Sequence, residues 1–518
     1  MMVICQSRPE IDIKGGGGVR EFSVVPRSMF AADGNMLHCS AKSALMSILE
    51  KPSDRSVEQA EPTDQLANAD GQIKVSIVDG MAEVQALEKT DWIKTCSDLA
   101  DHFTVTIFHK YRDADEVRVI FDRYDVPLSL KTATREFRQR GLEPISYKIT
   151  DTTQISNEPF LMQVPMKRLL AHVSTKDELT QYLASKTLEK GRQNGLHVVV
   201  AWSSKCRATH QDMAYLDSDQ EEADTKILLH AVDATASGAK SIKIFSPDTD
   251  VFVLALRRYP ELCADTSFVT GRGQRHRNIQ LRPIVRALGA ARTAALPGFN
   301  AWSGADVTGN FACKGKLECW KAFLQADEDC VTALADLGST ILPTAGMFYV
   351  IEKLVCQLYL PKTKISSLKD LRWLLFRRKQ AESERLPPTQ AALREAIKRA
   401  HYQAMIWAND KVPNPDLPSP ENYGWKKDKD KWIPVMTRLQ PAPDAVLYLV
   451  KCGCGKDKCR NNRCSCRRAG LTCTGLCSCS NDETGEECDN VDMIENDSCD
   501  DETSDEQDDD SEEDVDDE

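Results

Sequence analysis

The sequence lacks long apolar runs. None of its 518 residues falls in a stretch of about eighteen apolar residues, the length that a transmembrane helix needs. The opening MMVICQSRPEIDIKGGGGVREF lacks the apolar core of a secretory signal peptide. The four glycines at 15–18 are not followed by the Gly-Lys-Ser/Thr of a phosphate-binding loop. These absences argue against membrane, secreted and P-loop proteins, and they predict an intracellular chain without a membrane partner.

Positive charge is missing from the C-terminal end. Between Asp489 and Glu518 the chain has eighteen Asp or Glu residues and no Lys or Arg. Removing these eighteen negative charges from the formal net charge of −13 leaves +5 for the rest. A segment this acidic and this poor in apolar residues is predicted to be disordered. It could compete with DNA for basic surfaces or bind chromatin and other basic proteins, although most such runs are only solvated tails.

Cysteine is sparse outside one short segment. Nine of the 19 cysteines lie between Cys452 and Cys488, with the spacing C-x-C-x₄-C-x₄-C-x-C-x₆-C-x₃-C-x-C-x₈-C. In an intracellular chain such clustering predicts metal binding, and a disulfide-linked knot is the alternative. Close thiolates suit tetrahedral Zn²⁺, and nine sulfurs can hold about three ions if some sulfurs bridge. The predicted zinc ligands are Cys452, Cys454, Cys459, Cys464, Cys466, Cys473, Cys477, Cys479 and Cys488.

Strand-like and helix-like segments alternate in the central part of the chain. Four β-branched runs, at 73–80, 117–125, 196–202 and 242–245, are predicted strands, and helix-forming segments separate them. This alternation predicts an α/β fold with a mostly parallel sheet flanked by helices.

Changes in composition divide the chain into five predicted parts. They are a partly flexible N-terminal extension at 1–66, an α/β domain at 67–370, a helical and then proline-rich linker at 371–446, a small irregular cysteine-rich zinc module at 447–490, and an acidic tail at 491–518.

Carboxylates follow three of the predicted strands. Asp79 ends the first, Asp122 the second, and Asp248 and Asp250 follow the fourth. Ligands bind outside the carboxyl ends of parallel strands, so we expect these acids to converge. Crowded carboxylates cannot all stay ionised without cations, and oxygen ligands suit Mg²⁺ or Mn²⁺. Taken singly, each acid is equally well an ordinary turn or capping residue.

The motif order IVDG, IFDRYD, EEADTKILLHA, SPDTDVFVL and SGADVTGNF resembles that of the flap endonuclease/XPG group of PIN-like nucleases. The closer resemblance is to a transposon-associated animal branch of that group, over roughly residues 70–370. It implies a PIN-like fold and structure-selective hydrolysis of DNA phosphodiesters with two Mg²⁺ or Mn²⁺ ions. The implied metal ligands are Asp79, Asp122, Glu222, Asp224, Asp248, Asp250 and Asp306.

The chain departs from this family pattern at two positions. Asp224 stands where the group usually has Glu, which keeps the charge but shortens its reach. Asn300 stands where the animal branch usually has His. The second departure leaves a non-catalytic DNA- or chromatin-binding protein as the alternative function.

Basic residues follow two of the acidic motifs. Lys131, Arg135 and Arg138 fall on one face of a predicted helix directly after the second strand. The resemblance implies that this face stabilises charge on the scissile phosphate. Lys314 and Lys316, after the last acid, resemble the element with which these nucleases bind a DNA backbone. The alternatives are a solvated helix and an ordinary turn.

The cysteine spacing resembles that of the tesmin-like CXC domain, a DNA-binding zinc module. Arg463 stands where such repeats usually have Tyr, and the chain has one repeat where they tend to come in pairs. General nucleic-acid or protein binding and transcriptional regulation through this module therefore remain alternatives. A DNA-bound protein is expected in the nucleus. The predicted phosphate contacts are Lys456, Lys458, Arg460, Arg463, Arg467 and Arg468.

Overall fold

The protein forms two compact units in a computed structural model. One unit spans Lys14–Ala442, and the other combines Met1–Ile13 with Pro443–Glu518. The predicted acidic tail at 491–518 lies outside the described residues. No helix in the described ranges is long and apolar enough to cross a membrane. The described residues are 19–21, 23–39, 42–56, 72–87, 92–138, 146, 148–153, 170–378, 384–440, 451–454, 459–470, 472–473, 477–480 and 488–490.

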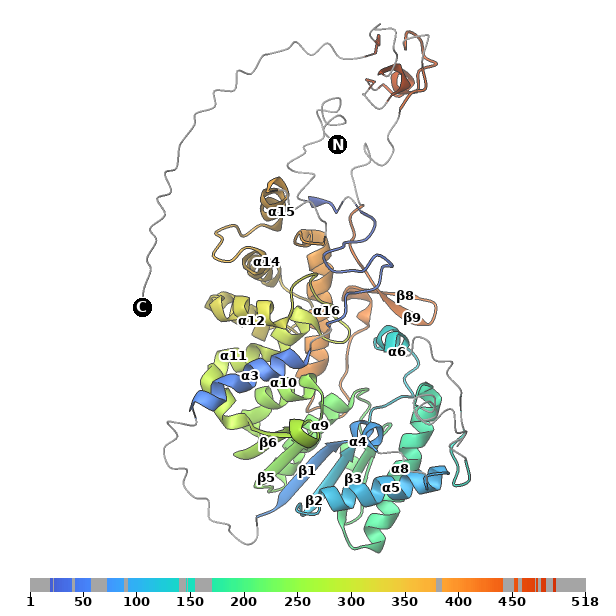
Figure 1. The fold of residues 1–518 in the computed structure, drawn as a ribbon, viewed down its shortest axis with the longest axis vertical. Helices are drawn as coiled ribbons and strands as arrows, with labels where there is room; N and C mark the ends of the chain where they lie inside the picture. The colour runs from blue at the N-terminus through green and yellow to red at the C-terminus, as the bar shows by residue number, and fades with distance from the viewer. Residues whose placement is uncertain are drawn as a thin grey trace, which may run out of the picture. The chain divides into compact units, whose positions relative to one another are not determined.

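A seven-stranded sheet lies at the centre of the larger unit (Figure 1). Its order is β4-β3-β2-β1-β5-β6-β7, and only the two edge strands, β4 and β7, run antiparallel to their neighbours. Helices flank this sheet, which confirms the predicted α/β class. The strands are β1 (Lys74–Asp79), β2 (Glu116–Ile120), β3 (His197–Trp202), β4 (Lys205–Ala208), β5 (Ser241–Phe245), β6 (Asp265–Thr270) and β7 (Arg277–Gln280).

Helices cover both sides of the sheet, so the inner strands bury apolar side chains on both faces. Successive side chains of a strand point to opposite faces, so Val75 and Ile77 join one core cluster and Val78 joins the other. The smaller cluster packs under α4 (Gly80–Ala86), α5 (Cys96–Lys110) and α8 (Val173–Gln193). The larger cluster packs under α3 (Ser43–Ser56), α9 (Ala223–Ala236), α10 (Thr249–Arg258) and α11 (Leu281–Gly304).

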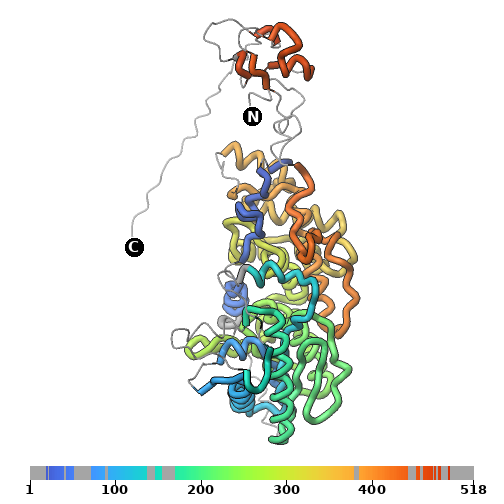
Figure 2. The backbone as a smooth tube through the Cα atoms, turned by 90° about the vertical axis from the view of Figure 1, so that its right-hand side faces the viewer, coloured from blue at the N-terminus to red at the C-terminus, as the bar shows by residue number. Residues whose placement is uncertain are grey.

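Further helices extend the larger core beyond the sheet. Figures 1 and 2 both show the helices between residues 316 and 408, coloured yellow to orange, stacked to one side of it. These helices are α12 (Lys316–Gln325), α13 (Glu328–Ala335), α14 (Ala345–Tyr359), α15 (Leu368–Arg377) and α16 (Gln390–Ala408). A two-stranded sheet of β8 (Trp425–Asp428) and β9 (Lys431–Pro434) follows α16.

Two predicted domain boundaries differ from this arrangement. Segment 371–446 was predicted to be a linker, yet α16 buries Leu393 and Trp407 in the main core. Just after α16, Asp410 is fully buried and its Oδ1 lies 2.6 Å from Nη2 of Arg258 in α10. At the other end, Leu45 of α3 packs in the same core, although 1–66 was predicted to be an extension. Apolar faces on amphipathic helices account for both differences.

Candidate acidic metal centre and cysteine cluster

The predicted acids lie where strands end and helices begin. Asp79 ends β1 and accepts a 2.9 Å hydrogen bond from the first turn of α4. Asp122 follows β2, and its Oδ1 accepts a 2.8 Å hydrogen bond from the backbone of Ala223, the first residue of α9. Asp248 caps α10 by accepting from the backbone of Asp250 at 2.8 Å. The exposed N–H groups and positive dipole ends of these helices favour carboxylates here.

The acids lie close enough to perturb one another's ionisation. Burial, followed by the negative charge of Asp122, raises the pKa of Asp79 to about 7. Burial, followed by the charge of Asp248, raises the pKa of Asp224 well above its usual value. Burial, followed by the charge of Asp250, raises the pKa of Asp248. A cation among these groups would relieve the same repulsion.

The tightest group of acids consists of Asp224, Asp248 and Asp250, whose ligand oxygens lie within 4.8 Å of one another. The Asp224 side chain belongs to a residue only 7% exposed. Within the described part of the chain, its carboxylate accepts no hydrogen bond. Octahedral Mg²⁺ at about 2.1 Å from its ligands places neighbouring oxygens about 3 Å apart. Small side-chain rotations would bring these carboxylates to that spacing, so the donor set fits Mg²⁺ or Mn²⁺.

Two lysine ammonium groups lie among the acids. Nζ of Lys42, just before α3, is 2.9 Å from Oδ2 of Asp250 and 2.8 Å from Oδ1 of Asp306. Nζ of Lys131 is 3.0 Å from Oε2 of Glu222 and 3.8 Å from Oδ2 of Asp306. Burial alone would lower the pKa of each lysine, but the surrounding carboxylates raise both overall. The motifs did not indicate Lys42, because a single lysine before a helix carries no distinctive sequence signal.

The predicted basic helix is α6 (Thr132–Arg138), which begins directly after Lys131. Nη2 of Arg135 lies 2.8 Å from Oε1 of Glu221, and its guanidinium stacks 5.8 Å from the ring centre of Tyr124. Arg135 is therefore held in place by its own protein beside the acidic centre. The Arg138 side chain lies outside the described residues.

Asn300 connects the acidic centre to a buried lysine. Its Nδ2 donates to Oδ1 of Asp250 at 2.8 Å, and Nζ of Lys316 donates to its Oδ1 at 2.7 Å. Lys316 is only 1% exposed, and its ammonium group is bonded within the protein. A buried ammonium group cannot reach a phosphate, so the predicted contact of Lys316 with a DNA backbone does not fit the structure. Lys314 is half-buried, with Nζ 4.9 Å from the ring centre of Tyr359.

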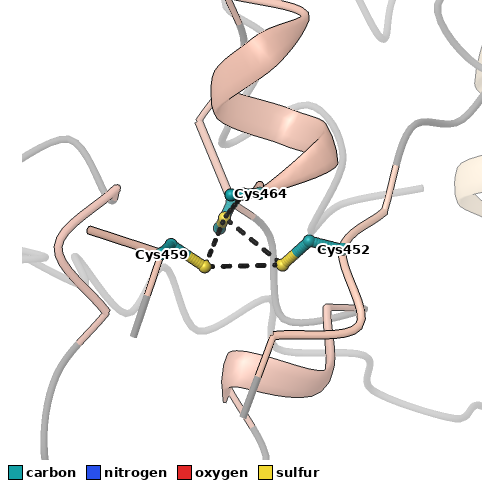
Figure 3. Close-up of side chains that lie close together, drawn as sticks. Cys452, Cys459 and Cys464 are labelled. Atoms are coloured by element: carbon teal, nitrogen blue, oxygen red, sulfur yellow. Dashed lines mark hydrogen bonds between the residues drawn. The ribbon is translucent and has the colours of Figure 1, made fainter. Parts of the chain in front are cut away.

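The smaller unit contains the nine predicted cysteines, whose sulfurs gather in one cluster. The Sγ–Sγ distance is 3.5 Å for Cys452 and Cys459 and 3.8 Å for Cys464 and Cys473. Figure 3 shows Cys452, Cys459 and Cys464 pointing toward one another. A Zn²⁺ tetrahedron with Zn–S bonds of about 2.3 Å has edges of about 3.8 Å, whereas a disulfide is about 2.05 Å long. None of the described cysteines forms a disulfide, and the spacing of the clustered sulfurs suits a metal.

Three groups of four sulfurs in this cluster could bind zinc. Cys473 belongs to all three groups, whereas Cys454 and Cys466 belong to none of those formed by the described residues. The groups are Cys452, Cys459, Cys464 and Cys473; Cys452, Cys473, Cys477 and Cys479; and Cys459, Cys473, Cys479 and Cys488.

The basic residues of this module differ in how they are held. Nε of Arg460 is 2.8 Å from Oδ2 of Asp489. Nη1 of Arg467 donates to the backbone carbonyl of Cys459 at 3.1 Å, so it stabilises the loop. Arg463 and Arg468 are exposed. The predicted contacts Lys456 and Lys458 lie outside the described residues.

The matches among solved structures include three T5 proteins. A T5 protein crystallised with metal ions is 12% identical with a TM-score of 0.34, over 65% of this chain and 91% of that chain. A T5 flap endonuclease in a pseudo-enzyme-product complex with DNA and metal ions is 13% identical with a TM-score of 0.33, over 65% and 90%. A T5 5′-exonuclease mutant is 11% identical with a TM-score of 0.31, over 65% and 90%. Scores this low do not by themselves establish a shared fold. No protein-family model and no curated protein matches the sequence.

Proposed function

We propose that this protein is a metal-dependent nuclease of the flap endonuclease type, which hydrolyses DNA phosphodiesters. The observation that carries the proposal is the group of carboxylates of Asp224, Asp248 and Asp250, two of them buried, with oxygens within 4.8 Å of one another. It lies at the carboxyl edge of a mostly parallel sheet, where such folds bind ligands. The motif resemblance assigns the same three residues to metal binding.

The residues of the chain divide into two roles in this proposal. Asp224, Asp248 and Asp250 hold a divalent cation, with Asp79 and Asp122 beside them. A bound Mg²⁺ or Mn²⁺ ion would lower the pKa of a water molecule and neutralise charge on the phosphate. Positive side chains stabilise the phosphate charge that develops during cleavage.

Lys131 and Arg135 supply that positive charge. The pKa of Lys131 is raised well above 10.5 because nearby carboxylates outweigh the effect of burial, so it stays charged at neutral pH. Arg135 is held by Glu221 and is charged at any physiological pH. Both side chains are paired with carboxylates in this structure. When DNA binds, each would exchange its carboxylate partner for a phosphate oxygen.

The test is cleavage of flap, nicked and single-stranded DNA by the purified full-length protein with Mg²⁺ or Mn²⁺. We expect an Asp248→Asn/Asp250→Asn variant to lose cleavage, because it loses two of the three grouped carboxylates. Asp113→Asn is the matched control, since the Asp113 side chain is 93% exposed. Uncut DNA with the wild-type protein, or equal cleavage by the double variant, would rule out the reaction.

The cysteine module is proposed to bind zinc and to tether the protein to DNA in the nucleus. The sulfur spacing supports zinc, and the exposed Arg463 and Arg468 could contact phosphates. The acidic tail is proposed to contact chromatin or basic proteins.

A non-catalytic DNA- or chromatin-binding protein is the second candidate function. The observation that favours it is the pairing of Lys42 with Asp250 and Asp306, which neutralises part of the acidic centre without any metal. This candidate predicts DNA binding without cleavage, and binding that is unchanged in the Asp248→Asn/Asp250→Asn variant.

A further inference from the structure

We infer that Lys42 takes the place of one divalent cation, so that the acidic centre binds one metal ion where the motif resemblance implies two. The inference rests on the proposed function, because it assumes that these carboxylates bind a divalent cation.

The ammonium group of Lys42 lies among three carboxylates. Its Nζ is 2.9 Å from Oδ2 of Asp250, 2.8 Å from Oδ1 of Asp306 and 3.9 Å from Oδ1 of Asp248. A Mg²⁺ or Mn²⁺ ion bound to the two nearer oxygens would sit about 2.1 Å from each. That ion would overlap the ammonium nitrogen, so the two cannot occupy this side of the centre together.

Asp224 and Asp248 are the acids left for a metal. Asp224 is 7% exposed, and no hydrogen-bond donor in the described ranges reaches its carboxylate. The charge of Lys131 acts on Asp224, but Lys131 makes no hydrogen bond to it, and a buried carboxylate without a direct donor is costly unless a cation binds it. Asp248 is beyond hydrogen-bond distance of Lys42 and lies in the same group of oxygens as Asp224. These two acids therefore form the remaining cation site, with Asp250 shared between metal and lysine.

The start of helix α3 holds Lys42 in position. Leu45, Met46 and Leu49 of this helix are buried in the main core, so the backbone at Lys42 is anchored beside α10 and α11. Its side chain is only 19% exposed. An anchored lysine at this place acts as a permanent internal cation, which a dissolved metal ion would have to displace.

The experiment counts Mn²⁺ ions bound to the full-length, zinc-loaded protein, by the loss of the free Mn²⁺ signal in electron paramagnetic resonance. The eighteen carboxylates of residues 489–518 are also expected to take up Mn²⁺, so an Asp224→Asn/Asp248→Asn variant with the same tail provides the background. We expect one ion above background for the wild type and two for Lys42→Met, which removes the ammonium but keeps the chain length. Lys42→Arg keeps the charge and is expected to bind one.

A second control removes a lysine from the same helix without touching the acids. Lys51 is exposed on α3, and Lys51→Met is expected to bind one ion.

Equal counts for the wild type and Lys42→Met, at one or at two ions, would overturn the inference and leave the proposed reaction intact. If Lys42→Met does not fold, two ions on the wild type alone would overturn it. If the wild type binds no Mn²⁺ above background, both the inference and the metal-dependent reaction are wrong. If it binds one ion but does not cut DNA, only the proposed reaction is wrong.

Discussion

Nζ of Lys316 donates a 2.7 Å hydrogen bond to Oδ1 of Asn300, and the amide of Asn300 donates in turn to Asp250. The two partners fix the amide orientation, because its oxygen faces an obligate donor and its nitrogen faces a carboxylate. A buried polar chain thus runs from the start of α12, through α11, to a carboxylate of α10.

Breaking this chain at its centre is expected to destabilise the protein. Asn300→Ala removes the donor to Asp250 and the acceptor of Lys316, and leaving buried partners unsatisfied costs about 1–3 kcal/mol. Urea unfolding of metal-free protein measures the loss. Asn194→Ala, at an exposed position after α8, is the control and should stay within about 0.5 kcal/mol of wild type. If Asn300→Ala lowers the free energy of unfolding no more than the control does, the hydrogen bonds from Lys316 through Asn300 to Asp250 do not stabilise the protein.

Lys316 is expected to make stability depend on alkaline pH. Burial lowers its pKa from 10.5 to about 8 in the folded protein. Between about pH 8 and 10.5 the unfolded chain therefore holds more protons at this residue, so the free energy of unfolding contributed by Lys316 rises with pH. Below about pH 8 both states are protonated and the contribution is flat.

The variant Lys316→Met lacks that titration. The unfolding free energy of the wild type minus that of Lys316→Met should increase from pH 7 to pH 10. The same difference for Lys243→Met, an exposed position in β5, should stay flat. A flat difference for Lys316→Met would mean that the lysine keeps its ordinary pKa.

Lys131 is expected to affect the chemical step more than DNA binding. If it supplies charge to the phosphate in the transition state, Lys131→Met should lower the single-turnover cleavage rate about 10²-fold, while the dissociation constant for DNA changes much less. Lys426→Met, at an exposed residue of β8, should cleave at the wild-type rate. A variant that weakens binding but cleaves bound DNA at full rate would place Lys131 in binding alone.

Cys473 is expected to matter more for zinc than Cys464, because its sulfur lies in three overlapping four-sulfur groups and can bridge two ions, whereas that of Cys464 lies in one group. Cys473→Ser should lose more than one equivalent of zinc, and Cys464→Ser, whose sulfur belongs to one group, should lose about one. Elemental analysis of the purified full-length protein gives both counts. Cys313→Ser removes an exposed thiol of the larger unit and should leave the zinc content unchanged. Equal losses from Cys473→Ser and Cys464→Ser would argue against the shared position.

The sheet and the places of its acids could be predicted because their signals are local. A β-branched run followed by an acid, as at Asp79 and Asp248, identifies both a strand and the edge at which its ligands lie. Lys42 could not be found in this way, since it reaches the centre from 264 residues away in sequence, at Asp306. Nothing near Lys42 in the sequence indicates that contact.

The helical segment after residue 370 packs into the main core although it is rich in basic residues. Arg399 contributes to the basic composition of α16, yet it is fully buried and its Nη1 donates to the carbonyl of Val435 at 2.8 Å. Lys314 and Lys316 also show that a motif does not reveal burial. The two lysines lie two residues apart, yet Lys314 is half-buried and Lys316 is buried. Only the packing of α12 against its neighbours decides which of them is enclosed.

The buried pair of Arg258 and Asp410 has a consequence for the order in which the protein is made. Helix α10 carries both Asp250 and Arg258, so the helix that supplies part of the acidic centre also carries a charge that is neutralised 152 residues later. A ribosome that has passed Asp306 has already made every acid of the centre, but Arg258 of α10 lacks its buried partner until Asp410 has also emerged. A chain that ends before Asp410 therefore contains all the acids of the centre but lacks one of the contacts that hold α10 in place.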